Sequence, residues 1–306
     1  MFSFFRSKKA AARSDAKPAP VKPSPAPKLR KVNIKKRFTT ITEIGQGSMS
    51  TVYKAVDNQS GRVVCLKVQD LVKTTAAAGR TRTEGRPSEG EIGLRIHHPN
   101  VVKTFEYGLS TRKEYWLSME FVEGVSLQYV REVKSRGLPA RLKLLIQAAD
   151  GLAAIHQAGF IHHDFGPKNV LVDQESVAKI IDFGLAVPNT PTFQRPGNRT
   201  GTLLYMAPEL IRRESTDERM DVFSFGIMAF ELLTDRQPYD ATDQIGIMRQ
   251  RMNLDPMDIA KAAPDRPENL CNIIRKTLTR RKEDRIRSMV EVANTLREVK
   301  LVARAR

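Results

Sequence analysis

Carboxylate and amide side chains recur at a fixed spacing in the middle of the chain. Asp164 precedes Asn169 by five residues, and a second aspartate, Asp182, is followed two residues later by Gly184. Oxygen ligands of this kind suit Mg²⁺, which binds one or two protein side chains and completes its shell with phosphate oxygens and water. A further carboxylate can orient a hydroxyl group for attack on phosphorus. The spacing therefore predicts a phosphoryl-transfer site.

Three segments in fixed order carry a resemblance to a known family. They read HHDFGPKN at 162–169, DFG at 182–184 and APE at 207–209. This order resembles the catalytic loop, the metal loop and the end of the activation segment in eukaryotic-type (Hanks-type) serine/threonine protein kinases. The resemblance runs from about Phe38 to about Leu301. It implies an ATP- and Mg²⁺-dependent enzyme that transfers the γ-phosphate of ATP to serine or threonine hydroxyls of proteins, in signalling and with autophosphorylation.

The resemblance assigns roles to the polar residues of these segments. Asp164 is expected to accept or orient the proton of the acceptor hydroxyl. Asn169 and Asp182 are expected to hold Mg²⁺ against the phosphates. Thr202, at the start of the expected substrate platform, would bridge Asp164 and Lys168. The expected catalytic set is Asp164, Lys168 and Thr202.

Two positions of the catalytic loop depart from the family pattern. Gly166 stands where serine/threonine kinases place a lysine that touches the transferred phosphate, so Lys168, two residues later, is our hypothesis for its replacement. His163 stands where many kinases have an arginine that binds a phosphorylated activation loop. A histidine can take that role only when it is protonated. Control by activation-loop phosphorylation is therefore not a firm expectation for this chain.

The nucleotide end is expected around a glycine-containing turn and an apolar strand. Glycines let the backbone approach phosphate oxygens closely, although Ser50 takes the place of the family's third glycine. Lys67 would be out of place in an apolar strand unless its charge were paired. By resemblance it binds the nucleotide phosphates and pairs with a helix glutamate. The family spacing of ten residues before Pro99 selects Glu89 as that partner.

The resemblance extends to the adenine pocket at the hinge between two lobes. Met119, Glu120 and Val122 are expected at this hinge, with the last two bonding the base through their backbone. The full set expected to bind ATP is Ile44, Gly45, Gln46, Gly47, Ser48, Val52, Cys65, Lys67, Glu89, Met119, Glu120, Val122 and Leu171. For the apolar members, ordinary core packing is the competing interpretation.

Short segments rich in β-branched residues follow one another in the first half of the chain. They predict strands at 39–44, 51–57, 62–69, 101–107 and 114–122. A helix is expected near 83–97, but Gly90 and Gly93 lie within it and each costs about 1 kcal/mol relative to alanine. We therefore expect this helix to be marginal and the Lys67–Glu89 pair to be a regulated contact.

Helical patterns take over after Ser126. Apolar residues at three- and four-residue spacing between Leu142 and His156 indicate an amphipathic helix. Further helices are expected near 219–234, 241–252, 267–279 and 288–300. Strands first and helices second indicate an α+β fold. The resemblance implies a bilobal one, with a small antiparallel sheet lobe carrying one helix at 37–122, a mainly helical lobe at 123–301 and a short basic end at 302–306.

Basic charge is concentrated at the start of the chain. The 306 residues carry a net charge of +17, of which residues 1–38 contribute +11, because they hold twelve Lys and Arg against Asp15 alone. Residues 1–36 are also rich in Pro and Ala, and they are expected to form a disordered tail. Such a tail is most often a solvated tether. The sharper hypothesis is a weak contact with an anionic membrane surface or with nucleic acid.

Composition narrows the class of protein and its location. No stretch approaches the roughly 18 apolar residues needed for a transmembrane helix. The only cysteines, Cys65 and Cys271, imply no disulfide framework and favour the reducing cytoplasm, with peripheral membrane contact possible through residues 1–38. Protein substrates are the expected partners. The oligomeric state does not follow from the sequence.

Two other functions stay open. The pattern in 162–169 also resembles the aminoglycoside and choline kinases, which phosphorylate small molecules. That group lacks counterparts of GTLLYMAPE at 201–209 and DVFSFG at 221–226, and both segments are present here. A pseudokinase scaffold is the second alternative. Gly166 and Ser50 leave room for it, although the five polar residues of the expected site are retained.

Overall fold

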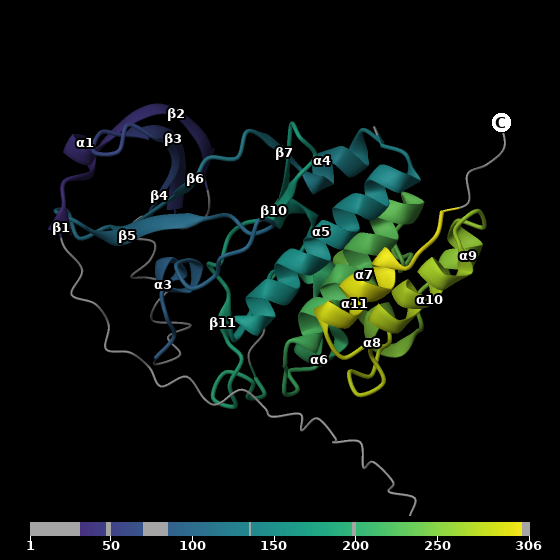
Figure 1. The fold of residues 1–306 in the computed structure, drawn as a ribbon. Helices are drawn as coiled ribbons and strands as arrows, with labels where there is room; N and C mark the ends of the chain where they lie inside the picture. Colours follow the sequence, from purple (N-terminus) through teal and green to yellow (C-terminus); the bar gives the residue numbers. More distant parts are fainter. Residues whose placement is uncertain (1–30, 47–49, 70–84, 135, 198–199, 302–306) are drawn as a thin grey trace, which may run out of the picture.

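The protein consists of a sheet lobe and a larger helical lobe that lie side by side (Figure 1). The computed structural model describes residues 31–46, 50–69, 85–134, 136–197 and 200–301. Strands occupy the first part of this chain and helices the second, so the predicted two-lobed α+β fold is confirmed.

Six strands form the sheet of the smaller lobe. They are β1 (Lys31–Val32), β2 (Phe38–Gln46), β3 (Ser50–Asp57), β4 (Val63–Gln69), β5 (Thr104–Ser110) and β6 (Tyr115–Glu120). Their spatial order is β1-β5-β6-β4-β3-β2, and all neighbours are antiparallel except β1 and β5. A small core of its own lies on this sheet and comprises Phe38, Ala55, Val64, Leu66 and Trp116.

The ordered fold reaches into the segment that was expected to be tail. β1 adds to the edge of the sheet beside β5, and helix α1 (Ile34–Arg37) follows it. The Asn33 side chain caps α1 by accepting a hydrogen bond from Lys36 N at 3.2 Å. Backbone pairing at an open sheet edge needs little side-chain burial, so the basic composition of this segment concealed it. Residues 1–30 lie outside the described residues.

Helix α3 (Glu89–Gly93) is much shorter than the helix expected near 83–97. Ser88 and Glu91 form a capping box, in which Ser88 N donates to Glu91 Oε2 at 2.6 Å and Glu91 N donates to Ser88 Oγ at 3.3 Å. This box satisfies backbone donors at the start of the helix. The first turn is therefore well defined although the helix has only five residues.

The glycines of α3 serve close packing rather than helix weakness alone. A Cβ on Gly90 would lie 2.3 Å from the Cβ of Tyr107, and one on Gly93 would lie 2.2 Å from Thr104 Oγ1. Both partners belong to β5, so only glycine lets the helix approach the sheet this closely. Sequence propensity indicated a weak helix, whereas the contact shows why the glycines are there.

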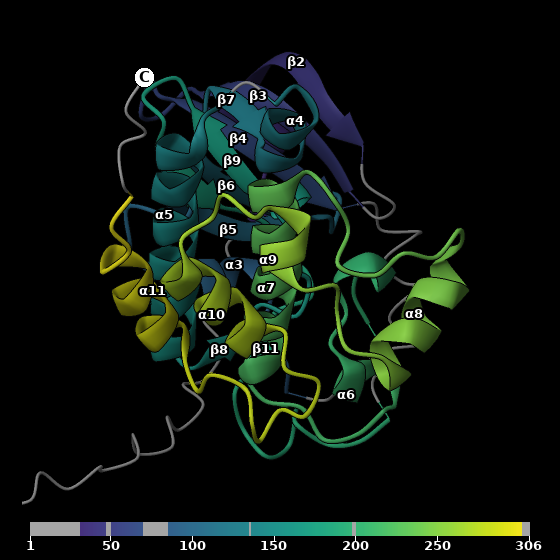
Figure 2. The same cartoon turned by 90° about the vertical axis from the view of Figure 1, so that its right-hand side faces the viewer.

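Eight helices are described in the larger lobe. They are α4 (Leu127–Glu132), α5 (Leu138–Gln157), α6 (Pro208–Ile211), α7 (Arg219–Thr234), α8 (Gln244–Asn253), α9 (Ile259–Ala262), α10 (Glu268–Thr277) and α11 (Met289–Arg297). The helices predicted near 219–234, 241–252, 267–279 and 288–300 correspond to α7, α8, α10 and α11. α11 lies along α5 in both views (Figures 1 and 2), and α7 contacts α5 and α10.

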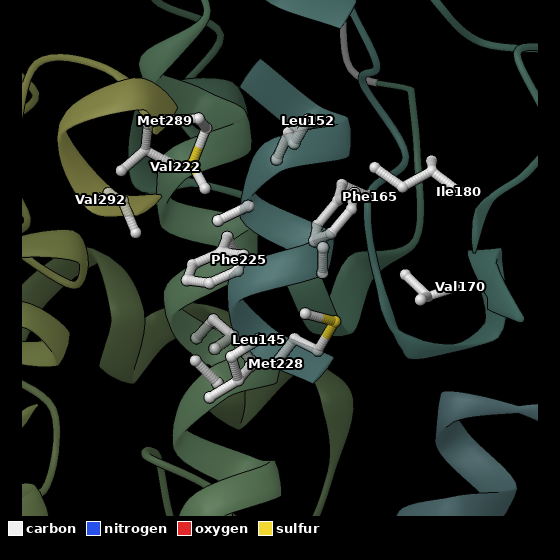
Figure 3. Close-up of a cluster of buried hydrophobic side chains, with 14 of the residues drawn as sticks. Leu145, Leu152, Phe165, Val170, Ile180, Val222, Phe225, Met228, Met289 and Val292 are labelled. Atoms are coloured by element: carbon white, nitrogen blue, oxygen red, sulfur yellow. The ribbon is translucent and has the colours of Figure 1, made fainter. Parts of the chain in front are cut away.

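The central helix α7 is buried on nearly all sides. Phe225 and Met228 of α7 face Leu145 and Leu152 of α5 in the core (Figure 3). Phe165, which follows Asp164 in the catalytic loop, stacks on Phe225 with ring centroids 6.3 Å apart. The catalytic loop therefore rests directly on the buried central helix of the lobe.

Short strands and turns fix the two loops that carry the chemistry. They are β7 (Gly124–Ser126), β8 (Phe160–Ile161), β9 (Val170–Asp173), β10 (Ala178–Ile180), β11 (Val187–Pro188) and the 3₁₀ turns η1 (Pro167–Asn169) and η2 (Leu203–Tyr205). β8 pairs with β11, and β9 lies between β7 and β10. Because β8 precedes Asp164 and β11 follows Asp182, this pairing keeps the two loops together.

Candidate active site

Three charged residues from distant parts of the chain meet beside the sheet. Lys67 Nζ of β4 lies 2.9 Å from Glu89 Oε1 of α3 and 3.0 Å from Asp182 Oδ1 of the metal loop. The side chains of Lys67 and Glu89 are 14% and 7% exposed, whereas Asp182 is 45% exposed. The structure thus forms the ion pair that the spacing from Pro99 predicts, and it adds Asp182 to it.

Electrostatics keeps Lys67 and Asp182 charged. Burial acts to lower the pKa of Lys67, but Glu89 and then Asp182 act against it, so the pKa lies above its ordinary value. Burial acts to raise the pKa of Asp182, but Lys67 and the Gly184 amide outweigh it, so the pKa lies below its ordinary value. An ammonium group and an ionised carboxylate therefore coexist here at neutral pH. That pair of charges suits a bound phosphate–cation complex.

The catalytic loop presents Asp164 in a fixed orientation. Thr202 N donates to Asp164 Oδ1 at 2.6 Å, while Asn169 Nδ2 donates to the Asp164 carbonyl oxygen at 2.8 Å and lies 3.4 Å from Oδ2. The sequence predicted that Thr202 bridges Asp164 and Lys168, and the contact with Asp164 runs through the Thr202 backbone amide. No side-chain bond between Thr202 and Lys168 occurs among the described residues.

A buried aspartate on α7 holds the backbone of this loop. Asp221 Oδ2 accepts from His162 N at 2.7 Å, and Oδ1 accepts from His163 N at 3.0 Å. His156 Nε2 of α5 lies 2.8 Å from Asp221 Oδ2. These bonds stabilise the left-handed backbone of His163, whose φ is 71°, a conformation that non-glycine residues rarely adopt. Strain of this kind is common at functional loops.

His163 cannot replace the family arginine as a permanent cation. It is 4% exposed, and burial lowers the pKa of its imidazole despite the opposing effect of Asp221. Its ring nitrogen Nδ1 lies 3.4 Å from Thr200 Oγ1 in the activation segment. The imidazole is therefore neutral at pH 7. A neutral imidazole offers no positive charge to a phosphorylated activation segment, which is the physical reason for the doubt that the sequence raised about phosphate binding at this position.

Several residues expected to bind ATP gather along the sheet. Cross-strand partners place Val52 opposite Lys67 and Cys65 opposite Met119, and Gly45 pairs with Val52. Leu171 lies on β9 and Val122 just after β6, both partly buried. Ile44 is exposed. The Glu120 side chain accepts hydrogen bonds from Lys103 N and Lys179 Nζ through Oε1. Gly47, Ser48 and the Gln46 side chain lie outside the described residues.

Gly166 and Lys168 differ sharply in their surroundings. A Cβ on Gly166 would lie 3.1 Å from the ring of Tyr205, so the place of the family lysine is packed against that ring. Lys168 is exposed on η1, between Asp164 and Asn169, and its side chain makes no hydrogen bond within the described part of the chain. Lys168 is therefore the basic side chain of this loop that stays free to meet a phosphate.

Arg251 of α8 anchors the expected substrate platform, a role that the sequence did not suggest. It is fully buried, and its terminal nitrogens donate to the carbonyl oxygens of Leu203, Leu204 and Met206 at 3.0, 2.7 and 2.8 Å. Burial lowers the pKa of its guanidinium to about 10, so the charge persists at neutral pH. In the sequence, the one signal that Arg251 is buried was its spacing of four residues from Ile247, which is also buried on α8.

The residues suited to hold Mg²⁺ fit that cation in their chemistry. The Asn169 side chain donates a hydrogen bond from Nδ2 to the Asp164 carbonyl oxygen, which leaves the side-chain oxygen Oδ1 of Asn169 available for a cation. Asp182 engages Lys67 and Gly184 N through Oδ1, and its Oδ2 makes no hydrogen bond within the described ranges. One amide oxygen and one carboxylate oxygen match the few protein ligands that Mg²⁺ takes when phosphates complete its shell. No cluster of three or more His, Cys, Asp or Glu suited to a metal occurs in the described residues.

Among residues 31–46, 50–69, 85–134, 136–197 and 200–301, no helix combines the length needed to cross a membrane with sufficient apolar character.

Comparison with known proteins agrees with this geometry. The profile described as "Protein kinase domain" matches residues 38–296. The chain is 32% identical over 234 residues to the probable serine/threonine-protein kinase pknA2 of Bifidobacterium longum, covering 74% of this chain and 30% of that protein. It is 32% identical over 271 residues to the serine/threonine-protein kinase pkn2 of Myxococcus xanthus, covering 85% and 32%.

A third relative shows the same pattern of coverage. The chain is 28% identical over 244 residues to the serine/threonine-protein kinase PrkC of Bacillus subtilis, covering 78% of this chain and 37% of that protein. The match thus spans about a third of the length of each of these relatives. The profile match covers the sheet lobe and the helical lobe together, including Lys67, Asp164 and Asp182. The chain belongs to the protein kinase family.

Proposed function

We propose that this chain is an ATP- and Mg²⁺-dependent protein kinase that phosphorylates serine and threonine hydroxyls of proteins. The observation that carries the proposal is the position of Lys67 Nζ, which lies 2.9 Å from Glu89 Oε1 and 3.0 Å from Asp182 Oδ1. His162 Nε2 lies 3.2 Å from Ile181 O, so the loop that presents Asp164 adjoins the metal loop.

Each polar residue has a separate task in this proposal. Lys67 binds the nucleotide phosphates, and Glu89 holds its ammonium group from the side of α3. Asn169 and Asp182 would hold Mg²⁺, which when bound neutralises charge on the phosphates during transfer. Asp164, fixed by Thr202 N, accepts the proton of the attacking hydroxyl and orients its oxygen. In this arrangement the protein contributes chiefly position and charge.

Lys168 completes the site as the contact to the transferred phosphate. It is exposed on η1, one residue before Asn169, while the position of the missing family lysine is packed against Tyr205. An ammonium group there lies on the same loop as Asp164, so it can stabilise charge that grows on the phosphoryl group. The residues that would surround the base are Val52, Cys65, Met119, Glu120, Val122 and Leu171, and Ile44 and Gly45 would lie near the phosphates.

The described substrate platform favours protein acceptors over small molecules. η2 is anchored by Arg251, and Glu209 forms a buried ion pair with Arg285 at 2.8 and 3.0 Å. Tyr205 Oη donates to Glu231 Oε2 at 2.9 Å, which fastens the platform to α7. A platform held at three points supplies an extended surface for a polypeptide. A small-molecule phosphotransferase has no need of it.

The protein is further proposed to act in the cytoplasm and to contact anionic surfaces through its basic N-terminal residues. Cys65 and Cys271 carry free thiols, which fits a reducing compartment such as the cytoplasm. The basic residues 1–38 supply a charge that attracts anionic membrane surfaces or nucleic acid, in addition to the protein substrates. Signalling through phosphorylation of partner proteins, and autophosphorylation, are the cellular roles that this arrangement supports.

Product analysis tests the proposal. The protein is incubated with labelled ATP, Mg²⁺ and either a peptide library or a panel of aminoglycosides and choline, and the products are identified by mass spectrometry. We expect label on serine and threonine of peptides or of the protein itself, and none with Asp182→Asn. Label on small molecules alone supports the small-molecule alternative, and absence of label with retained nucleotide binding supports a pseudokinase.

A further inference from the structure

Arg86 links the segment before α3 to the metal loop. Its Nε donates to Ala186 O at 2.9 Å, and its terminal nitrogen donates to Gly184 O. The side chain is partly buried, and no carboxylate in the described residues forms an ion pair with it. Its charge is therefore directed at backbone carbonyls. Hydrogen bonds from a charged donor are stronger than those between neutral groups.

Both carbonyls belong to a tight turn that starts at Asp182. Gly184 N donates to Asp182 Oδ1 at 3.0 Å, and Ala186 N donates to Phe183 O at 3.0 Å. Asp182 itself has a φ of 66°, in the left-handed region that costs energy for a non-glycine residue. A conformation of this kind persists only where neighbouring contacts hold it. Arg86 supplies two of those contacts from outside the turn.

The contacts form a closed circuit. Glu89 binds Lys67, Lys67 binds Asp182, Asp182 accepts from Gly184 N, and the carbonyl of Gly184 accepts from Arg86. Arg86 lies three residues before Glu89 in the chain, so the circuit returns to the segment where it began. The position of α3 and the position of the metal loop are thereby coupled.

Lys67 also contacts the metal loop, but through the Asp182 side chain and not through the main chain. His163 is buried and neutral at the position where relatives of this family carry an arginine that binds a phosphorylated loop. The bonds from Arg86 go to main-chain oxygens, which are present whether or not a side chain is phosphorylated. A main-chain anchor thus does not require a phosphate group.

We propose that Arg86 is a positioning residue for Asp182, and that through it the metal loop is held in place without a phosphorylated activation segment. The inference rests on the proposed kinase function and deepens its regulation. Arg86 touches neither nucleotide nor substrate in this arrangement. It acts by fixing the turn that presents the Asp182 carboxylate.

Three variants of the full chain test this role. Arg86→Ala removes both donors, Arg86→Lys keeps a charge that can reach one carbonyl at a time, and Arg95→Ala is the matched control. Arg95 is exposed just after α3, and its side chain makes no hydrogen bond in the described ranges. Peptide phosphorylation is measured against Mg²⁺ concentration at saturating ATP, together with the melting temperature and the KM for peptide. A phosphatase-treated sample, checked by mass spectrometry, is assayed beside each.

The expected pattern separates positioning from folding. With two charge-assisted bonds lost, Arg86→Ala should lower kcat by about tenfold or more and raise the Mg²⁺ concentration for half-maximal rate. Its KM for peptide and its melting temperature should match those of Arg95→Ala, Arg86→Lys should recover part of the rate, and phosphatase treatment should leave the wild-type rate unchanged.

The contrary outcomes are distinct. An Arg86→Ala enzyme with the Mg²⁺ requirement of Arg95→Ala, or a wild-type rate that collapses after dephosphorylation, overturns the role of Arg86. A wild-type protein without any peptide phosphorylation instead overturns the proposed function itself, so the two failures can be told apart.

Discussion

Gly93 of α3 and Thr104 of β5 touch so closely that a Cβ at residue 93 would lie 2.2 Å from Thr104 Oγ1. The helix that carries Glu89 is thereby set against the sheet that carries Lys67. Helix propensity favours alanine over glycine by about 1 kcal/mol, so propensity and packing predict opposite effects of a substitution. This opposition makes the contact a sensitive test of what positions the ion pair.

Gly93→Ala should push α3 away from β5 and weaken the Lys67–Glu89 pair. We expect a lower rate of phosphorylation, and faster amide exchange in α3 than in wild type. Thr104→Ala in the same chain removes the clashing oxygen and leaves a Cβ contact at 3.1 Å, so it should restore part of the rate. A Gly93→Ala protein that is more active and more stable than wild type would show that propensity outweighs packing here.

Lys168→Ala tests the basic side chain of the catalytic loop. Because Lys168 is exposed and outside the ATP-binding set, kcat should fall by on the order of tenfold to a hundredfold while the KM for ATP changes little. Lys168→Arg should retain much of the rate, since the charge is kept. Lys143→Ala, an exposed lysine on α5, is the control and should behave as wild type. Equal rates for Lys168→Ala and Lys143→Ala would remove Lys168 from the mechanism.

Arg251→Met tests the anchor of the substrate platform. The substitution removes the guanidinium donors from the carbonyl oxygens of Leu203, Leu204 and Met206. Each buried carbonyl that is left unsatisfied costs about 1–3 kcal/mol. We expect the KM for peptide to rise at least about tenfold, with the KM for ATP unaffected. Arg249→Ala, on the exposed side of α8, should leave both constants unchanged. A rise in the KM for ATP instead would place Arg251 in a general folding role.

The Cys65 thiol should react slowly although it lies among the residues expected around the base. Burial raises the pKa of this thiol to about 11, although Lys67 acts in the opposite direction. At pH 8 the thiolate fraction is then on the order of one in a thousand. Mass spectrometry should find slow alkylation of the native protein by iodoacetamide, with rapid alkylation after unfolding in urea. Fast modification of native Cys65 at pH 8 would contradict a protonated, partly buried thiol.

Asp57 should make the stability of the sheet lobe depend on pH. The hydrogen bond from Arg37 Nε, at 2.6 Å, is the largest cause that holds the pKa of Asp57 down at about 2. Because the pKa of Asp57 is lower in the folded state, ionised Asp57 contributes to the free energy of unfolding. This contribution is fully present above the ordinary pKa of 3.8 and disappears as the pH falls toward 2. Asp57→Asn should therefore destabilise at pH 7, by on the order of 1 kcal/mol after allowance for solvent screening, and hardly at pH 2. A difference in unfolding free energy that is independent of pH would exclude this ion pair as its source.

Local motifs were sufficient to predict the order and fold of the chain but not its distant contacts. Lys67 and Asp182 are 115 residues apart; the resemblance supplied the role of each residue, but the contact between them was not predicted. Glu89 could be selected among neighbouring glutamates by its spacing from Pro99. Arg86 and Arg251 could not be found in this way, because both donate to main-chain oxygens, which leave no trace in side-chain sequence patterns.

The glycines of α3 show where propensity is ambiguous. Gly90 and Gly93 lower the helix propensity of the segment, and the helix near 83–97 is indeed reduced to five residues. The sequence alone gives no reason for their presence, since the reason is the approach of Tyr107 and Thr104 from β5. Thr202 illustrates a similar limit. Its position beside Asp164 follows from the family pattern, but the choice of amide over hydroxyl depends on the backbone path.

The most direct test of the central claim compares wild type with Asp164→Asn at saturating Mg²⁺ and ATP. Calorimetry measures nucleotide binding, and transfer of the labelled phosphoryl group from ATP to peptide measures turnover. We predict that both proteins bind ATP with similar affinity and that only the wild type phosphorylates serine or threonine, because Asp164 orients the acceptor and leaves the nucleotide contacts of Lys67 untouched. A wild-type protein that takes up no ATP, or an Asp164→Asn variant that turns over at the wild-type rate, would contradict the account.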